Sequence, residues 1–536
     1  MTPQQGGQPS SAGFAASPAV AEKFAQFGPR YRMFAVLTAM MGTLATLLPA
    51  TIVNVVIPEI IGAFGIGQDK AQWLATGFMA SSTITMLAHS WMVHAVGVRV
   101  TFLISLIVFM CGSIAGLFAP NEDILIAIRV FQGAAAGVMT PLTMMIMFQV
   151  FPPDQRGRAM GIFAMGTVMA PALGPSIGGL VIDSLGWRYI FFLELPLLFI
   201  ALALGSLFLT DREATGPREK FDWAGLFLAS IFVGSLLVGL SDGQQDGWHE
   251  NHVLALLITA AVSFVAFILL ELVTPQPLLQ LRVFQQPSFP MVAIILFVFG
   301  NGLFGSTYLA PLFMQTVQGS TALSAGLMLM APGLVMMFVF PVAGALSDRF
   351  GPVLPMVIGM GLFAVSCHLM TGLDLNAPFL TITLWIIVGR IGLGMVMPAM
   401  TAAAMTGMPL HLVAQASGLN NFTRQLGGAF GVNLSSILLS QRTDFFSEAM
   451  APTQTAGNTA TQELLDGLGA LFERAGLSEL AQQEVALFYL DRMIHSQAYM
   501  LAFRDVFTIL TWVFVLAIIP ALMIRSRPVS PPAPAV

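Results

Sequence analysis

Long apolar stretches, separated by short polar or Gly- and Pro-containing breaks, run along almost the whole chain. A helix needs about 20 apolar residues to cross the hydrocarbon layer of a membrane. One polar segment, 441–498, is too long to be an ordinary loop. The pattern predicts fourteen spans, at 34–58, 72–95, 100–119, 124–150, 159–182, 188–209, 222–240, 252–272, 289–312, 323–346, 353–373, 379–405, 415–440 and 499–524.

The composition agrees with a polytopic membrane protein. Of the 536 residues, 56% are hydrophobic and only 9% are charged, whereas soluble proteins carry about 25% charged residues. The two cysteines, Cys111 and Cys367, both lie inside apolar stretches, so we expect no disulfide framework. The first 30 residues are rich in Gln, Gly, Ser, Pro and Ala and are expected to form a disordered tail.

An even number of spans places both termini on the same side of the membrane. Most of the 22 Lys and Arg residues then fall in the loops on that side, Arg30, Arg99, Arg156 and Arg158 among them. Because short cytoplasmic loops carry an excess of Lys and Arg, we expect both termini to be cytoplasmic.

Small residues recur at helical spacing in the fifth predicted span, which reads GTVMAPALGPSIGG from residue 166 to 179. A ridge with a residue at every fourth position lets another helix approach closely. Two prolines beside this ridge each remove a backbone hydrogen bond, so we expect this helix to bend. The ridge is formed by Gly166, Ala170, Gly174 and Gly178, and the prolines are Pro171 and Pro175.

The second half of the chain repeats features of the first. Arg129 precedes Gly133 by four residues in the fourth span, and Arg390 precedes Gly394 by four in the twelfth. Paired halves around a central site are a common plan for transporters. We therefore predict an all-α architecture with a cytoplasmic tail at 1–32, a six-helix bundle at 33–210, a two-helix insert at 211–287, a second six-helix bundle at 288–524 that includes the outer loop 441–498, and a cytoplasmic tail at 525–536.

Six motifs stand out along the chain: TIVNVVIP at Thr51–Pro58, RVFQG at Arg129–Gly133, APALGPSIGG at Ala170–Gly179, WRYIFFLELP at Trp187–Pro196, GALSDRFG at Gly344–Gly351 and NFTRQLGG at Asn421–Gly428. These motifs resemble the major facilitator superfamily, in its fourteen-helix drug–proton antiporter branch, and are most similar to EmrB-type multidrug exporters. The resemblance implies the major facilitator fold, proton-coupled transport, and export rather than import, since APxxGPxxGG is the branch's exporter motif.

Three positions depart from that family pattern. Pro49 stands where an acidic residue is common in the first span, and His94 stands where the first gate loop usually has an aspartate. Glu194 replaces a usual asparagine in the sixth span. These departures leave open which residue binds the proton.

Ionisable residues inside spans are the candidates for proton coupling, because they are rare there and mark ion pathways. Glu194 is the first candidate, although its position near the outer end of its span is also compatible with a hydrated side chain. Arg129, with Gln132 on the same helical face, either takes part in a proton relay, as the resemblance implies, or extends to the outer interface. Arg390 has the same two interpretations, and His89 is either a proton carrier or a packing residue.

The loops at the cytoplasmic ends of the spans contain the candidate gate. Asp348 lies with Arg349 between Gly344 and Gly351, and it can interact with the positive end of the eleventh helix and with a nearby arginine. The resemblance implies that this contact closes the inner gate. The alternative is a solvated loop pair, and further candidates for gate or packing roles are Arg424, His94 and Arg99.

Other sites are defined more weakly. Thr51 and Asn54 share one face of the first span and are candidates for the substrate cavity, and Gly179 completes the exporter motif. The HENH run at 249–252 has no third ligand nearby, so we expect no metal site. No phosphate-binding or cofactor motif lies in a suitable context, and we expect no cofactor, no enzymatic activity and no nucleic-acid partner.

The long outer loop contains apolar residues at helical spacing, at Leu464, Leu465, Leu468, Leu471 and Phe472. Another stripe begins with Val485, Phe488 and Leu490. Such amphipathic helices lie on a membrane, cover a cavity or bind a partner. The resemblance implies a periplasmic adaptor and an outer-membrane channel as partners, if the host has an outer membrane.

Together, these patterns predict a proton-driven exporter of amphipathic compounds in the bacterial inner membrane, working by alternating access. Two alternatives remain at this point. One is a dedicated exporter of a metabolite, fatty acid or siderophore with the same fold. The other is a membrane sensor that no longer transports, which the absence of an acidic residue at Pro49 allows.

Overall fold

The computed structural model describes residues 18–210, 220–320, 322–406, 408–409, 412–455, 457–474 and 479–524. Sixteen α-helices make up most of this described part, and fourteen of them have 18 or more residues. The first half contains α1 (Pro18–Phe27), α2 (Tyr31–Phe64), α3 (Gln68–Val96), α4 (Val98–Leu117), α5 (Glu122–Val150), α6 (Arg156–Leu185), α7 (Tyr189–Phe208), α8 (Trp223–Gln245) and α9 (Asn251–Val273). The second half contains α10 (Phe289–Thr316), α11 (Ala322–Phe350), α12 (Val353–Met370), α13 (Phe379–Met405), α14 (Val413–Met450), α15 (Thr459–Arg474) and α16 (Glu479–Met523).

The fourteen long helices, α2–α14 and α16, occupy the fourteen predicted positions. Within the described residues, eleven helical segments are long and apolar enough to cross a membrane. The helices α3, α6 and α14 are not among them. In α14 the physical reason is visible, because Gln415, Asn420 and Asn421 are buried in the protein and not exposed to lipid.

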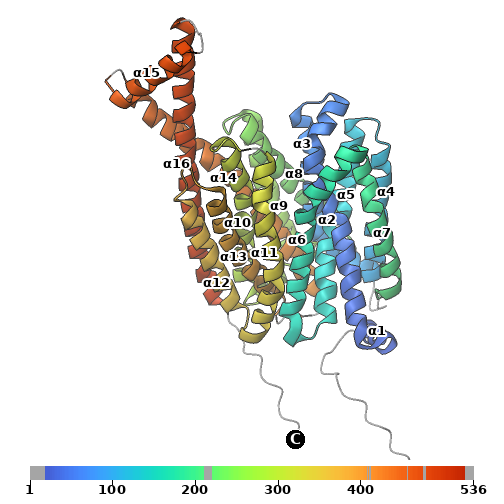
Figure 1. The fold of residues 1–536 in the computed structure, drawn as a ribbon. Helices are drawn as coiled ribbons and strands as arrows, with labels where there is room; N and C mark the ends of the chain where they lie inside the picture. Colours follow the sequence, from blue (N-terminus) through green and yellow to red (C-terminus); the bar gives the residue numbers. More distant parts are fainter. Residues whose placement is uncertain are drawn as a thin grey trace, which may run out of the picture.

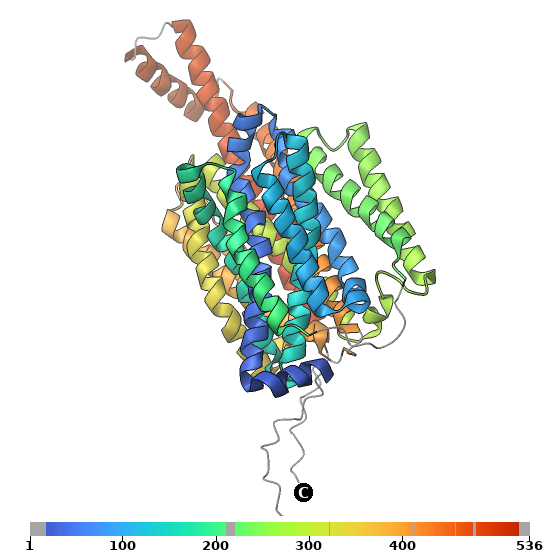
Figure 2. The ribbon, with the colours of Figure 1, turned by 90° about the vertical axis from the view of Figure 1, so that its right-hand side faces the viewer.

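Figure 1 shows two groups of upright helices side by side. Helices α2–α7 pack together as one six-helix bundle, and α10–α14 with α16 form the second. Helices α8 and α9 pack on each other and lie at one side of the molecule, where α8 contacts α3 and α14 (Figure 2). Helix α1 lies at one end of the molecule, called here the α1 end, and α15 lies at the other, the α15 end.

The small-residue ridges bring equivalent helix pairs together in the two bundles. A Cβ built on Gly166 would lie 2.8 Å from Met40, and one built on Gly178 would lie 2.8 Å from Ile52, so the ridge of α6 packs on α2. In the second bundle, Gly431 of α14 packs against the backbone of Asn301 in α10. Helix α6 is continuous from Arg156 to Leu185.

The two bundles contact each other through glycines near the α1 end. A Cβ on Gly157 of α6 would collide with the backbone oxygen of Gly344 in α11, and the reverse is also true. One helical turn further along, a Cβ on Gly161 would lie 2.6 Å from the Phe340 carbonyl oxygen. Helices α3 and α14 form a second contact, where a Cβ on Gly418 would lie 2.6 Å from the Met86 carbonyl oxygen. Close backbone packing therefore joins the bundles at this end.

The segment 441–498 is largely helical where it is described. Helix α14 continues to Met450, α15 contains the predicted stripe from Leu464 to Leu471, and α16 begins at Glu479. Together they project beyond the bundles at the α15 end (Figure 1). The second predicted amphipathic helix, around Val485, is not a separate element, because it is continuous with the last span in α16.

Candidate functional site

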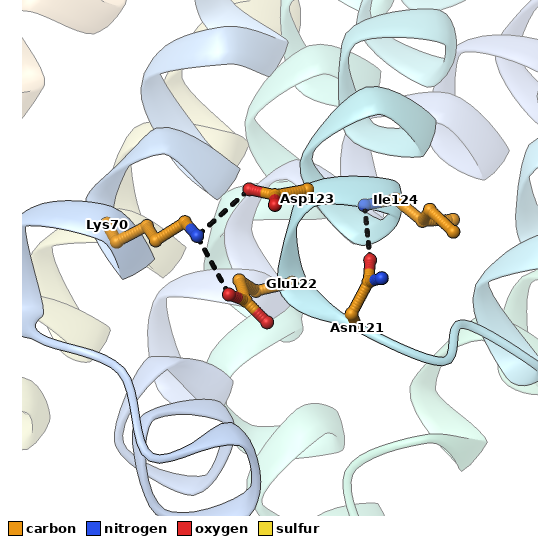
Figure 3. Close-up of polar contacts among 5 residues, drawn as sticks. All are labelled: Lys70, Asn121, Glu122, Asp123 and Ile124. Atoms are coloured by element: carbon orange, nitrogen blue, oxygen red, sulfur yellow. Dashed lines mark hydrogen bonds and ion pairs between the residues drawn. The ribbon is translucent and has the colours of Figure 1, made fainter.

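The start of α5 is fixed by polar contacts at the α15 end of the first bundle (Figure 3). The Asn121 side chain caps the helix by accepting the Ile124 N–H at 3.0 Å. Lys70, in the first turn of α3, binds Glu122 at 2.8 Å and Asp123 at 3.0 Å. These two hydrogen bonds raise the pKa of Lys70. The contacts hold α3 and α5 together at the start of α5. The next polar residue of α5 lies about 10 Å further along the helix axis, at 1.5 Å of rise per residue.

That residue is Arg129, whose side chain is completely buried. Its Nη1 donates to Gln132 Oε1 at 3.0 Å, and its Nε donates to the Leu74 carbonyl oxygen of α3 at 3.4 Å. The guanidinium lies 4.3 Å from the centre of the Phe78 ring. Its Nη2 has no hydrogen-bond partner among the described residues. Because Arg129 is enclosed and hydrogen-bonded, it does not extend to the outer interface.

Gln132 connects this cation to a buried carboxylate. Its Nε2 donates to Glu194 Oε2 at 3.3 Å and to Ser113 Oγ at 3.0 Å. Ser113 of α4 donates to Glu194 Oε2 at 2.5 Å. Gly112 makes room for this contact, since a Cβ there would lie 2.7 Å from Gln132 Cγ. Arg129, Gln132, Ser113 and Glu194 thus form one network, named here the α5 network, contributed by α4, α5 and α7.

The α5 network is buried and contains one cation and one acid. Glu194 is only 1% exposed, and Gln132 and Ser113 are fully buried. The amide of Gln132 separates the guanidinium from the carboxylate, so the two charges interact without forming an ion pair. An acid that is buried and lacks a direct counter-ion is able to exist in both protonation states. The hydrated alternative for Glu194 is therefore wrong in this structure.

The equivalent arginine of the second bundle has a different environment. Arg390 is 6% exposed, and its Nη2 donates to Thr307 Oγ1 at 2.7 Å. It lines a cavity of about 20 Å³ with Cys367 and Ser366, which is enough space for about one water molecule. None of the described residues that line this cavity is acidic. The two arginines are thus equivalent in sequence but differ in chemistry, because among the described contacts only those of Arg129 lead to a carboxylate.

His89 lies apart from both arginines, at the contact between the bundles. Its ring is fully buried and lies beside the backbone of Ala414 in α14. Within the described residues neither ring nitrogen has a partner with regular hydrogen-bond geometry, and the Ala414 backbone is the polar group beside the ring. Of the five candidates for proton coupling, the structure brings Arg129, Gln132 and Glu194 together and places Arg390 and His89 elsewhere.

The predicted gate aspartate connects the two bundles. Asp348, near the end of α11, accepts the Gly157 N–H at 2.6 Å and the Arg158 N–H at 2.9 Å. Both N–H groups belong to the first turn of α6, where unpaired N–H groups and the helix dipole favour an anion. The predicted partner, the eleventh span, is therefore wrong: Asp348 contacts the start of the fifth span.

The other gate candidates surround this contact. Gly344 provides the close approach to Gly157, and Gly351 adopts a left-handed conformation, with φ of 82°, between α11 and α12. Arg349 is exposed, and its guanidinium lies 5.1 Å from the ring of Phe350 and not at Asp348. Arg424 is half-buried and donates to Asn421 Oδ1 at 3.2 Å.

In the first bundle's equivalent loop, His94 Nδ1 lies 2.9 Å from the Ser90 carbonyl oxygen. Arg99 is half-buried, and its backbone N–H donates to the Thr210 carbonyl oxygen at 3.2 Å. Neither His94 nor Arg99 is a partner in the two hydrogen bonds that Asp348 accepts from α6. The described contact of Asp348 between the bundles therefore involves α6 and α11.

Some predicted residues lie outside the described part of the chain. These are the side chains of Thr51, Asn54, Pro171 and Pro175, together with Gly179. Helix bending at the prolines and the substrate cavity near Thr51 therefore stay predictions. Within the described residues no group of three or more His, Cys, Asp or Glu side chains is placed to hold a metal ion. His252 lies 3.0 Å from Asp246.

Sequence reasoning missed several members of these sites. Ser113 is one serine among many in apolar spans, and its role depends on the packing of α4 against α7. The Leu74 carbonyl oxygen and the Phe78 ring belong to α3, and nothing in their spacing points to Arg129. Asn421 lies in a motif that carried the resemblance, and its Nδ2 lies 3.5 Å from Met144 Sδ in the opposite bundle.

The comparisons with known proteins agree with this architecture. Residues 39–432 match the family model of the Major Facilitator Superfamily. A multidrug resistance protein B homolog of Mycobacterium tuberculosis is 30% identical over 90% of this chain and 87% of its own length. The multidrug export protein EmrB of Haemophilus influenzae is 26% identical, over 88% and 91%. The crystal structure of the human organic anion transporter MFSD10 shares the fold, with a TM-score of 0.59 and 13% identity, over 91% of this chain and 99% of that one. The chain therefore belongs to the major facilitator superfamily, is a multi-pass membrane transporter and not an enzyme, and is similar to its EmrB-like drug exporters.

Proposed function

We propose that this transporter exports amphipathic compounds in exchange for protons, and that Glu194 is the residue that binds the transported proton. The observation that carries the proposal is the α5 network. A carboxylate that is 1% exposed accepts hydrogen bonds from Ser113 and Gln132 and is linked through Gln132 to a buried arginine. Buried acids in membrane proteins are costly and mark proton pathways.

The direction of transport follows from the family resemblance and from the charge distribution. The motif around Ala170 and Gly174 is the one that the resemblance links to exporters of this branch. Of the relatives above, one is named a multidrug resistance protein B homolog and the other a multidrug export protein. Lys and Arg are concentrated in loops at the α1 end, which we assign to the cytoplasm together with both termini. The host membrane is then the bacterial inner membrane.

Alternating access follows from the contacts between the bundles. The Asp348 contact with α6 and the glycine contacts close the α1 end, and they have to break for the other state to form. We propose that the two bundles rock against each other across the interface formed by the pairs α3–α14 and α6–α11. Proton release from Glu194 and substrate release then occur on opposite phases of the cycle.

The helical projection at the α15 end is the proposed docking surface for a periplasmic adaptor, which itself contacts an outer-membrane channel. Leu471, Leu487 and Phe488 are exposed there, at 59%, 50% and 61%. Deletion of residues 450–485 is expected to remove adaptor binding and leave membrane insertion unchanged. Co-purification of the deletion variant with the adaptor would contradict this part of the proposal.

The central test is ethidium transport in proteoliposomes driven by an imposed pH gradient. The Glu194→Gln variant preserves the volume of the side chain and removes its proton-binding ability, so gradient-driven uptake is expected to be lost. Glu122→Gln is the matched control, because Glu122 lies in the same bundle but only pairs with Lys70 at the surface. Full gradient-driven transport by Glu194→Gln would refute the proposal. Transport of several unrelated compounds would separate a multidrug exporter from a dedicated one.

A further inference from the structure

Two acidic residues of the two-helix insert meet at the α1 end, away from the α5 network. Asp222 precedes α8, and its Oδ1 accepts the Gly225 N–H at 2.7 Å as a helix cap. Glu271 lies near the end of α9 and is only 3% exposed. Its Oε2 accepts the Leu279 N–H at 3.0 Å. One oxygen of each carboxylate is therefore satisfied by backbone.

The other oxygen of each carboxylate is buried and has no partner. Asp222 Oδ2 and Glu271 Oε1 make no hydrogen bond with any described residue. Both face the same small space beside Gly225. A Cβ built on Gly225 would lie 2.7 Å from Glu271 Oε1 and in collision with Asp222 Oδ2. Two ionised carboxylates in this position would repel each other, and each unpaired oxygen would cost free energy.

The charged groups that the structure describes on neighbouring elements are exposed or make other contacts. Lys220, before α8, and Arg282, after α9, are exposed. His94 of α3 contacts the Ser90 carbonyl oxygen, and Arg424 of α14 binds Asn421. Within the described part of the chain, no salt bridge involves Asp222 or Glu271. No described cation neutralises this pair.

We propose that Asp222 and Glu271 form a second proton-binding site, in which one proton is shared between Asp222 Oδ2 and Glu271 Oε1. The protonated carboxyl donates its hydrogen to the opposite carboxylate, so one proton satisfies both oxygens and removes one of the two charges. The proton comes from water through Asp222, which is half-buried, and no other reactant is needed. Carboxylate pairs that share a proton are well known at close distance.

This shared proton fixes the insert to its surroundings. Glu271 holds the segment that leads from α9 to α10 through Leu279. Phe221, next to Asp222, packs on Trp91 of α3 with ring centres 4.5 Å apart. Loss of the proton separates the two acids and loosens α8 from α9 at the α1 end. The site is distinct from Glu194, which lies in the other half of the membrane.

The test uses the full-length protein in detergent, with Glu194→Gln as the parent so that the proposed transport site contributes nothing. Thermal unfolding midpoints are measured across pH. The folded parent holds a proton that the unfolded acids release at neutral pH, so its stability falls as pH rises. The additional variant Glu271→Gln donates a permanent hydrogen bond to Asp222, and its midpoint is expected to fall less with pH than that of the parent. Glu250→Gln, at the exposed start of α9, is the matched control and should behave as the parent.

Asp222→Asn provides a second variant that keeps the helix cap and removes the acid pair, and it should also reduce the pH dependence. Infrared spectroscopy of the parent is expected to show a protonated-carboxyl band near neutral pH that Glu271→Gln lacks. Equal pH dependence in the parent and both variants would overturn the proposal. Stabilisation of the parent by added calcium or sodium, and not of Glu271→Gln, would also overturn it and would indicate a cation site.

Discussion

Replacing Asp348 with asparagine removes a charge from the contact between α11 and α6, which we propose closes the α1 end. In the structure both carboxylate oxygens accept backbone N–H groups of α6, at 2.6 and 2.9 Å. Asparagine has one oxygen and one N–H₂ group, so one backbone N–H of α6 would face another donor. The variant thus loses one hydrogen bond and the favourable interaction of an anion with the start of a helix.

The size of the effect follows from these two losses. A hydrogen bond to a charged group contributes about 1.5–3 kcal/mol, and an anion at a helix start about 0.3–1 kcal/mol. Asp348 is half-buried, so water compensates part of the loss. We expect a net shift of about 2 kcal/mol toward the state that is open at the α1 end, which is roughly a 30-fold change in the ratio of the two states.

Spin-label distance measurements across the α1 end are a direct assay. Labels at Asp154, before α6, and Phe350, at the end of α11, are on exposed positions of the two bundles. Cys111 is exposed and has to be replaced, whereas Cys367 is buried. The long-distance population should increase in Asp348→Asn and stay unchanged in Asp466→Asn, an exposed aspartate of α15.

Gly344→Ala tests the same contact by a different route. Its Cβ would collide with the backbone oxygen of Gly157. Because this oxygen belongs to the backbone of α6, the collision is relieved only if α6 and α11 move apart. It should therefore increase the same long-distance population. If both variants keep the closed distance distribution of the parent protein, the assignment of Asp348 and Gly344 to the gate is wrong.

Four further substitutions test other parts of the structure. Gly178→Val places side-chain atoms where Ile52 already lies, 2.8 Å from the Cβ position, and should destabilise the first bundle by about 1–3 kcal/mol, measured as a lower unfolding temperature in detergent; an unchanged temperature would contradict the packing of α6 on α2. Arg129→Leu leaves Gln132 Oε1 without its donor and should abolish gradient-driven transport at normal expression. Arg390 is not linked to a described acid, so Arg390→Leu should retain at least part of this transport. Equal transport rates in the two variants would contradict the proposed difference between the arginines. Lys70→Ala removes only a surface pair and should leave transport at the parent rate; a large loss of transport would show that this pair does more than hold α3 and α5 together.

The number and order of the helices were predictable because apolar length is imposed by the membrane itself. The ridge from Gly166 to Gly178 was predictable for another reason, because only small residues let two helices approach closely. The identity of contacting helices was less accessible. Asp348 binds the backbone of Arg158 at the start of α6, 190 residues away in sequence. A sequence motif shows only which residues are neighbours along the chain, so it favoured a partner close to Asp348 in sequence.

In the α5 network, too, some residues could be predicted from the sequence and others could not. Arg129, Gln132 and Glu194 stood out because charged and amide groups are rare in spans. Ser113 did not, because serine is common in membrane helices and hydrogen-bonds to its own backbone as readily as to a neighbour. The insert acids Asp222 and Glu271 lie near span ends, where an acidic residue does not by itself indicate a functional site. Only packing shows that Glu271 is buried and that both acids face Gly225.

Proton release on substrate binding tests the central claim most directly. Purified protein in weakly buffered detergent solution is mixed with ethidium while a pH indicator reports released protons. If Glu194 exchanges its proton for substrate, the unmodified protein releases protons on mixing and Glu122→Gln does so equally, whereas Glu194→Gln still binds ethidium and releases none. Equal proton release by Glu194→Gln and the unmodified protein would contradict the account.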